Sequence, residues 1–168
     1  MRCIAETIPG APPVRLPDDR PAVALRNFRP TDVPFVAAIV ADALREHYDP
    51  TLYQSLSAEW PEGFLIAADP RDVPVGFLLG VHQVEGEVRI LMFAVDRNHR
   101  TQGIGALLMG TFFDRSRARG FRRVTLEVRV SNARAIRFYT RFRFSVIDLL
   151  RAYYSDGENG YQMARELP

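Results

Sequence analysis

The chain has 168 residues, a length typical of one folded domain that can bury its own core without disulfides or metals. Its formal net charge of +2 is too small by itself to indicate a nucleic-acid or membrane surface. All 22 basic residues are arginine. The absence of lysine excludes a Walker-type phosphate loop, a Schiff-base lysine and the strand lysine of protein kinases.

Cysteine and histidine give no sign of a metal site. Cys3 is the one cysteine, so an internal disulfide and a cysteine-based metal cage are excluded. The three histidines, His47, His82 and His99, do not have the spacing of a zinc site. No apolar run approaches the ~18 residues of a membrane span, and no signal-peptide core is found. We therefore expect a cytoplasmic protein with no metal and no membrane contact.

The predicted elements alternate between strands and helices. Five prolines in the first 21 residues predict an extended tail over 1–20 and a single domain over 21–168. Thr31 or Asp32 is expected to cap the first helix, which ends near Leu44. One further short helix is expected within 45–60. Strands are predicted at 22–28, 64–68, 73–84, 87–95, 124–128, 144–150 and 161–165, and helices at 104–119 and 133–141. This order predicts an α/β (α+β) fold with a mixed sheet and helices on its faces.

Residues 94–106 predict a binding site for a phosphate group. The segment runs from the end of a predicted strand into the longest predicted helix, and Gly103 and Gly105 leave room for a ligand near the backbone. The first turn of a helix presents unpaired N–H groups and the positive end of its dipole. Arg100 adds a fixed positive charge. Taken alone, however, a G-x-G pattern is equally typical of a tight strand–helix turn.

Two blocks of sequence resemble the GCN5-related N-acetyltransferase (GNAT) superfamily. V-D-R-N-H-R-T-Q-G-I-G, residues 95–105, is similar to the family's pyrophosphate loop, Q/R-x-x-G-x-G/A. L-E-V-R-V-S-N-A-R-A-I-R-F-Y, residues 126–139, resembles the block in which a strand, an Asn and a helix with a Tyr line the other side of the cofactor. The resemblance implies the GNAT fold, a mixed sheet of about seven strands flanked by about four helices.

The resemblance also implies that the chain binds acetyl-CoA. In the family, backbone groups at the end of the fourth strand hydrogen-bond the pantetheine arm, and the loop amides hold the pyrophosphate. Strands 87–95 and 124–128 are expected to splay apart and leave a slot for the thioester. Asn132 is expected to bond the pantetheine, to cap the following helix, or to do both. The cofactor-binding residues implied are Phe93, Ala94, Val95, Arg100, Thr101, Gln102, Gly103, Ile104, Gly105, Ala106 and Asn132.

Tyr139 and Glu127 are the catalytic candidates. Tyr139 matches the tyrosine beside the cofactor sulfur, where a phenol can protonate the leaving thiolate; the alternative is a core tyrosine. Ribosomal-protein-alanine N-acetyltransferases share L-E-V-R-x-S-N and have a proposed general base at the position of Glu127. A carboxylate there can take a proton from an α-ammonium group, whose pKa is near ~8. The alternative is an ion pair with an arginine such as Arg129, although we expect those two side chains on opposite sheet faces. His82 and His99 are rival bases.

Two further segments narrow the predicted substrate. L-R-E-H-Y, residues 44–48, is similar to L-P-E-N-Y of the N-terminal acetyltransferase A catalytic subunit and its archaeal relatives, where it contacts the incoming N-terminus. Residues 153–163 resemble their Y-Y-x-D-G-E-D-A-Y-x-M hairpin, which closes over the peptide; the alternative for both segments is a surface loop. Arg45 and His47 depart from the first pattern, and Arg143 stands where many relatives have Gly. The substrate-binding residues implied are Glu46, Tyr48, Tyr153 and Tyr154.

The sequence therefore predicts an acetyl-CoA-dependent N-acetyltransferase that modifies the α-amino group of protein N-termini by direct attack in a ternary complex. The alternatives are a small-molecule amine acetyltransferase and an inactive acyl-CoA-binding subunit. Arginines at positions 115, 117, 119, 122 and 123 either dock an auxiliary subunit or the ribosome, or form a solvated helix end. No direct nucleic-acid readout is expected. Without a lysine, any self-acetylation must fall on the chain's own N-terminus.

Overall fold

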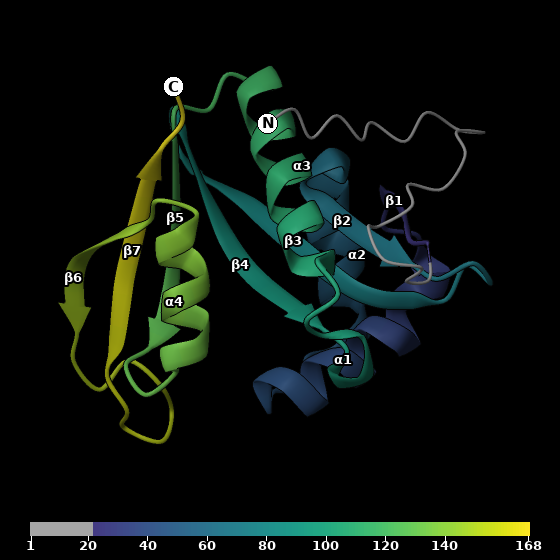
Figure 1. Ribbon diagram of the computed structural model, residues 1–168, viewed down its shortest axis with the longest axis horizontal. Helices are drawn as coiled ribbons and strands as arrows, with labels where there is room; N and C mark the ends of the chain where they lie inside the picture. The colour runs from purple at the N-terminus through teal and green to yellow at the C-terminus, as the bar shows by residue number, and fades with distance from the viewer. Residues whose placement is uncertain (1–21) are drawn as a thin grey trace.

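The computed structural model describes residues 22–168, and within them seven strands form one sheet (Figure 1). The strand order is β1-β2-β3-β4-β5-β7-β6. β4 and β5 run parallel, and every other neighbouring pair is antiparallel. The strands are β1 Ala24–Asn27, β2 Phe64–Ala68, β3 Pro74–Val84, β4 Glu87–Val95, β5 Arg123–Arg129, β6 Ser145–Leu150 and β7 Gly160–Glu166. The predicted mixed sheet is confirmed, whereas the predicted tail over 1–20 lies outside the described residues.

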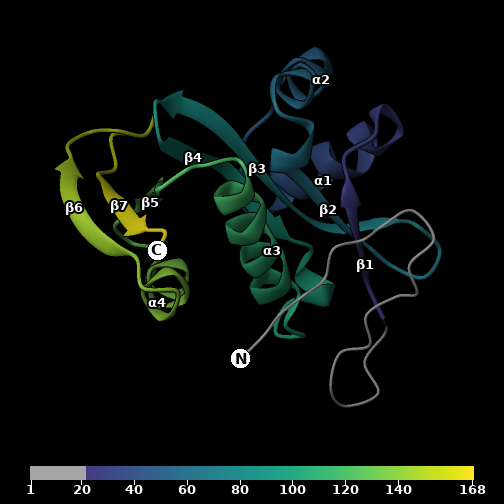
Figure 2. The same cartoon turned by 90° about the horizontal axis from the view of Figure 1, so that it is seen from above.

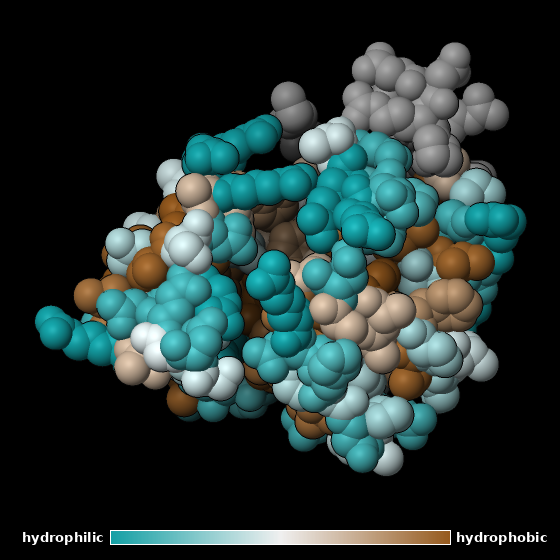
Figure 3. All heavy atoms as spheres, turned by 90° about the horizontal axis from the view of Figure 1, so that it is seen from below, coloured by the Kyte–Doolittle hydropathy of each residue, from teal (hydrophilic) through white to brown (hydrophobic). Residues whose placement is uncertain are grey.

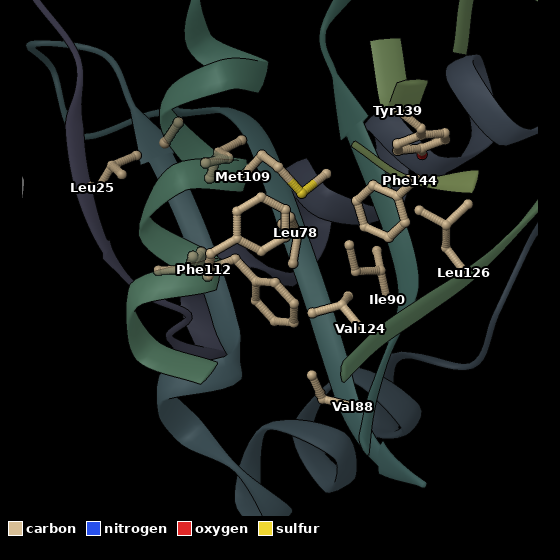
Figure 4. Packing of buried hydrophobic residues seen from close by; sticks show 14 of the residues in the cluster. Leu25, Leu78, Val88, Ile90, Met109, Phe112, Val124, Leu126, Tyr139 and Phe144 are labelled. Carbon is tan, nitrogen blue, oxygen red and sulfur yellow. The ribbon is translucent and has the colours of Figure 1, made fainter. Parts of the chain in front are cut away.

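Four α-helices cover the two faces of the sheet in residues 22–168 (Figure 2). They are α1 Val33–Leu44, α2 Pro50–Glu59, α3 Ile104–Ala118 and α4 Ala133–Arg141. One core cluster joins α3 and α4 to the sheet, and Figure 4 shows its members Met109 and Phe112 on α3 beside Ile90 and Leu126 of the sheet. A second cluster joins α1 and α2 to the opposite face. Each helix therefore buries an apolar stripe against strands that are apolar on both faces.

A β-bulge at Leu91 divides β4 into two halves. Leu79 pairs with Met92 and Gly80 pairs with Ile90, so Leu91 has no partner on β3. An extra residue reverses the alternation of side chains along a strand. Ile90 accordingly packs in the α3–α4 cluster, whereas Met92 packs in the α1–α2 cluster. Pairing of β4 with β5 ends at Ile90↔Leu126, immediately before the bulge. The two parallel strands separate beyond it, which confirms the predicted splay.

The start of α1 differs from the sequence-based expectation. Asp32 is the residue before α1, but its side chain makes no capping hydrogen bond to the helix. Its carboxylate accepts hydrogen bonds from the Arg29 N–H at 2.7 Å and from two guanidinium nitrogens of Arg26 at 2.7 and 2.9 Å. The prediction that a Thr31 or Asp32 side chain caps α1 is therefore wrong. A buried arginine on β1 takes the carboxylate instead.

Candidate active site

A cavity of about 800 Å³ lies beside the end of β4, where β4 has separated from β5. It is bounded by β4, the loop into α3, one side of α4, and Ala43 and Leu44 of α1. Because α1 covers the opposite face of the sheet from α3 and α4, the cavity reaches both faces. Figure 3 shows a hollow with a hydrophobic floor among hydrophilic side chains. Ten predicted cofactor-binding residues line it: Phe93, Ala94, Val95, Arg100, Thr101, Gly103, Ile104, Gly105, Ala106 and Asn132.

The loop into α3 is held in a shape that turns its backbone toward this cavity. Thr101 and Gly103 adopt left-handed backbone angles, with φ of 64° and 85°. Arg100 donates a hydrogen bond from Nε to the carbonyl of Val95 at 2.9 Å, so this arginine helps to shape the loop as well as line the cavity. Gln102 is not among the lining residues, since its side chain donates to the Asn98 carbonyl at 3.2 Å. Its Oε1 is buried and accepts no hydrogen bond from residues 22–168, so the backbone N–H is the donor that Gln102 has left for a phosphate.

Asn132 and His99 each have a structural partner in addition to lining the cavity. The Asn132 side chain accepts a hydrogen bond from the Ala135 N–H at 3.1 Å and so caps α4. His99 Nδ1 lies 2.9 Å from a carboxylate oxygen of Asp96. Burial raises the pKa of Asp96, but hydrogen bonds from His99 and the Asn98 N–H outweigh it and bring this pKa below its usual value. An anionic partner ties His99 to the loop.

Tyr139 is the buried polar residue of the cavity wall. Its ring, 8% exposed, packs against Phe93, Phe138 and Phe144, with centroid distances between 5.7 and 6.4 Å. Figure 4 shows it beside Phe144 at the margin of the core. Burial raises the pKa of Tyr139 well above 10, and the nearby Tyr154 raises it further. The phenol therefore keeps its proton throughout the physiological pH range and can donate a hydrogen bond into the cavity.

Glu127 lies on the opposite face of the sheet and pairs with Arg89. Arg89 Nε donates to Glu127 Oε2 at 2.7 Å, and its Nη2 donates to the Tyr153 hydroxyl at 2.9 Å. The Glu127 and Arg89 side chains are 10% and 25% exposed. No hydrogen bond reaches Glu127 Oε1 from residues 22–168. The alternative of an ion pair between Glu127 and an arginine is therefore found, but the partner is Arg89 and not Arg129. Arg129 binds Asp156 and Glu158, both at less than 3 Å.

The expectation that Glu127 and Arg129 point to opposite faces is also wrong, because residues two apart along a strand share a face. The guanidinium of Arg129 lies 4.0 Å from the centroid of the Tyr154 ring. Burial raises the pKa of Tyr154 to about 12, opposed by Arg129 and supported by Tyr153, Glu127 and Glu158. Glu127, Arg129 and Tyr154 thus form one cluster on the α1 side of the sheet.

The four predicted substrate residues come together from two loops. Burial raises the pKa of Tyr48, and the charges of Glu46 and Tyr153 raise it further, so these three groups lie near one another. Tyr153 and Tyr154 meet edge to face at 5.1 Å between centroids. The α1–α2 loop and the β6–β7 loop therefore approach each other beside Glu127. None of the four lines the cavity that holds the predicted cofactor residues.

The loop after α1 has a backbone that its Pro-containing counterparts cannot adopt. Arg45 ends α1 with φ of 57°, a left-handed conformation. Proline is fixed near φ of about −65°. The departure at this position therefore changes the local shape of the loop.

Comparison with known proteins decides the family. A model of the Acetyltransferase (GNAT) family matches residues 33–144. The chain belongs to the GNAT family of acetyltransferases. It is 33% identical over 155 residues to an N-alpha-acetyltransferase of Sulfurisphaera tokodaii, covering 85% of this chain and 92% of that protein. These findings confirm the predicted enzyme class.

Two solved structures of GNAT proteins are similar to this chain. Ard1 from Thermoplasma volcanium superposes with a TM-score of 0.83 at 38% identity, covering 87% of this chain and 98% of that one. The ribosomal-protein-S18-alanine N-acetyltransferase of Escherichia coli gives 0.74 at 26% identity, covering 86% and 94%. The two subfamilies indicated by the sequence blocks are therefore both found among the GNAT relatives.

The rival base His82 lies away from the GNAT cavity. It is an exposed β3 residue whose ring lies 5.5 Å from that of Phe121, near the start of β5.

The arginine cluster at the end of α3 is largely used within the fold. Arg117 pairs with Asp114, and Arg123 pairs with Glu87 and Glu166. Arg115 binds the Glu62 carbonyl at 2.9 Å. Only Arg119 and Arg122 of this cluster are exposed.

Sequence reasoning missed three arginines of α4 that line the GNAT cavity, Arg134, Arg137 and Arg141. Their spacing of three and four residues places them along one side of the helix. That spacing was visible in the sequence.

Within residues 22–168 no group of three or more His, Cys, Asp or Glu side chains is arranged to hold a metal ion. No helix in the same part of the chain is long and apolar enough to cross a membrane.

Proposed function

We propose that this GNAT protein transfers the acetyl group of acetyl-CoA to the α-amino group of protein N-termini. One observation carries the proposal. The buried Tyr139 lies in the cavity wall where β4 and β5 separate, and the carboxylate of Glu127 lies with tyrosines at the same separation on the other face of the sheet. A donor and an acceptor that enter from opposite faces would meet at Tyr139 and Glu127. This layout suits direct transfer in a ternary complex.

The cavity residues fit the acetyl donor. A volume of about 800 Å³ lies within the range of about 300–1,000 Å³ typical of small-ligand sites. The loop from Thr101 to Ala106 leads into the N-terminus of α3, whose free N–H groups and dipole suit a diphosphate. The end of β4 has lost its β5 partner, which leaves backbone groups at Phe93–Val95 for the amides of pantetheine. Acetyl-CoA supplies an activated acetyl thioester.

Glu127 has one carboxylate oxygen available for a proton from the acceptor ammonium group. Oε2 is held by Arg89, which fixes the orientation of the carboxylate, and Oε1 is left for the incoming amine or an intervening water. Removal of that proton makes the amine nucleophilic, and its attack on the acetyl carbon breaks the bond from that carbon to sulfur. The ammonium proton is passed to Glu127 and then to solvent. The second proton, which nitrogen loses as the amide forms, ends on the thiolate and gives free coenzyme A.

Tyr139 stabilises the sulfur that leaves. A thiol has a pKa near ~8.5, well below that of the buried phenol, so complete transfer of the phenol proton to a thiolate is uphill. The Tyr139 hydroxyl therefore donates a hydrogen bond to the developing negative charge. That charge-assisted bond is stronger than one between neutral groups.

The two loops beside Glu127 would receive the peptide. Glu46 supplies a negative charge that suits the ammonium group, and Tyr48, Tyr153 and Tyr154 supply surfaces and hydroxyls for the first residues of the peptide. The named N-alpha-acetyltransferase of Sulfurisphaera tokodaii supports a protein acceptor over a small-molecule amine. We place the enzyme in the cytoplasm, where new N-termini emerge. Exposed Arg119 and Arg122 are the part of the α3 cluster left to contact an auxiliary subunit or the ribosome.

Acetylation of a peptide library tests the proposal. The library varies the first two residues and carries an internal lysine in every member, and mass spectrometry locates each acetyl group. Because the chain has no lysine, every acetyl-lysine detected belongs to a peptide. We expect α-amine modification that depends on the first two residues. Equal modification of lysine and α-amine would overturn the N-terminal assignment, and donor binding without transfer to any peptide would favour the inactive subunit.

A further inference from the structure

The cavity wall formed by α4 carries an unusual row of positive charge. Arg134, Arg137 and Arg141 line the cavity, and all three are exposed at its rim. None of their guanidinium groups has a hydrogen bond or ion pair to any residue within 22–168. Arg100 and His99 also line this cavity, whereas no Asp or Glu does. The side chains that line the cavity therefore carry a net positive charge, which an anionic ligand would balance.

Most of this row is unfavourable for the helix itself, although Arg141 lies in the last turn, where the helix dipole favours positive charge. Positive side chains three and four residues apart on a helix repel each other. Arg134 is the second residue of α4, where the helix dipole disfavours positive charge, and the first turn contains no acidic residue. The row extends along α4 for about 10 Å. A feature that costs helix stability and lines a cavity points to a bound ligand.

The diphosphate of the donor does not account for the row. The α3 N-terminus, the loop amides and Arg100 already face the position expected for two bridging phosphates. Coenzyme A carries a third phosphate, a monoester on the 3′ position of its ribose, with a charge of about −1.5 to −2 at pH 7. Guanidinium groups suit a terminal phosphate because each can donate two parallel hydrogen bonds.

We propose that Arg134, Arg137 and Arg141 bind the 3′-phosphate of the acetyl donor and make the enzyme selective for coenzyme A over 3′-dephospho-coenzyme A. The inference rests on the proposed function, since it takes the donor to be a coenzyme A thioester. Arg137 lies at the centre of the row, so its loss has the largest single effect. Arg134 and Arg141 extend the positive field on either side.

Calorimetric binding of coenzyme A and of 3′-dephospho-coenzyme A to the full chain tests this inference without turnover. The wild-type protein is expected to prefer coenzyme A by about 10- to 100-fold, the range for hydrogen bonds to a charged group. Arg137→Gln should reduce that preference by at least about threefold, and the triple Gln variant should bring it close to one. Affinity for the dephospho form should stay within about twofold in every variant.

The matched control is Arg122→Gln, which removes the same charge from an exposed site that does not line the cavity and should leave the preference unchanged. Thermal melting without ligand provides a second readout. The α4 variants should melt at the same or a higher temperature, because repulsion along the helix is relieved. Loss of binding would then not be attributable to unfolding.

Three outcomes overturn the inference, and they are distinguishable. Equal wild-type affinity for both ligands shows that no 3′-phosphate site exists, while peptide acetylation by acetyl-CoA would still uphold the proposed function. An equal loss of affinity for both ligands in the α4 variants shows that the arginines bind the diphosphate or attract the ligand only through the total charge of the cavity. Failure of the wild-type protein to bind either ligand overturns the proposed function together with this inference.

Discussion

Replacing Glu127 with Gln separates a catalytic role from a structural one. The substitution keeps the shape of the side chain and an oxygen that can accept a hydrogen bond from Arg89, but it removes the charge and the proton acceptor. A general base contributes typically about 10²- to 10⁴-fold, so kcat should fall by that factor. The side chains of the pair are 10% and 25% exposed, between a surface pair and a fully buried one. The cost in stability should therefore be about 1–2 kcal/mol.

Arg89→Gln is the matched control, because it breaks the same ion pair and leaves the carboxylate in place. Its stability loss should be similar, about 2–8 °C in Tm, whereas its kcat should fall by less than about tenfold. Initial rates with a peptide at saturating concentrations of both substrates, together with thermal melts, measure the two effects. Suppose instead that both variants lose the same activity and the double variant loses no more. Glu127 would then act only as the partner of Arg89, and our reasoning about the base would be refuted.

Three further predictions follow from single residues. Tyr139→Phe keeps the ring contacts and removes the hydroxyl, so kcat should fall about 10- to 100-fold. Coenzyme A affinity, measured by calorimetry, should stay within about threefold of the wild-type value. An unchanged kcat would contradict the proposed hydrogen bond to sulfur. Arg143 adopts φ of 62°, so Arg143→Gly should raise stability by about 1 kcal/mol in thermal melts, whereas Arg143→Ala, which keeps a Cβ, should give no such gain. Hydrogen bonds from Ser131 and Arg129 lower the pKa of Glu158 from 4.5 to about 2. A carboxyl group whose pKa is lower in the folded state stabilises the fold at pH values above its pKa in the unfolded state. This stabilisation is lost as the pH falls toward 2. Melting temperatures of wild type and Glu158→Gln should therefore differ at pH 6 and converge near pH 2; a constant difference would show that ionisation of Glu158 contributes nothing.

Local signals in the sequence predicted the elements because they act over a few residues. Gly86 has φ of 76° in the β3–β4 hairpin, and Gly120, with φ of 88°, follows the end of α3. The cofactor loop was equally visible, since its glycines, its arginine and the following helix are contiguous. The four predicted substrate residues came from a resemblance, and the structure brings them together from two loops.

Interactions between distant strands could not be predicted in the same way. Arg89 and Glu127 are 38 residues apart, and their pairing depends on the register of β4 with β5. The bulge at Leu91 was hidden because I-L-M-F-A-V, residues 90–95, is continuously apolar, so the alternation that would reveal an extra residue is absent. Asp32 shows a related limit: its local sequence is typical of a cap, but Arg26 on β1 reaches the carboxylate first.

The bulge in β4 has a consequence for how such an enzyme can diversify. Arg89 and Phe93 are both odd-numbered residues of one strand, yet Arg89 contacts Glu127 on the α1 side of the sheet and Phe93 lines the cavity on the other face. Without Leu91, both halves of β4 would keep one alternation, and β5 would have no reason to separate at Ile90. Under the proposed function, the extra residue lets the first half of the strand vary with the acceptor while the second half stays matched to the donor. One inserted residue thus makes the two specificities of the enzyme separately adjustable.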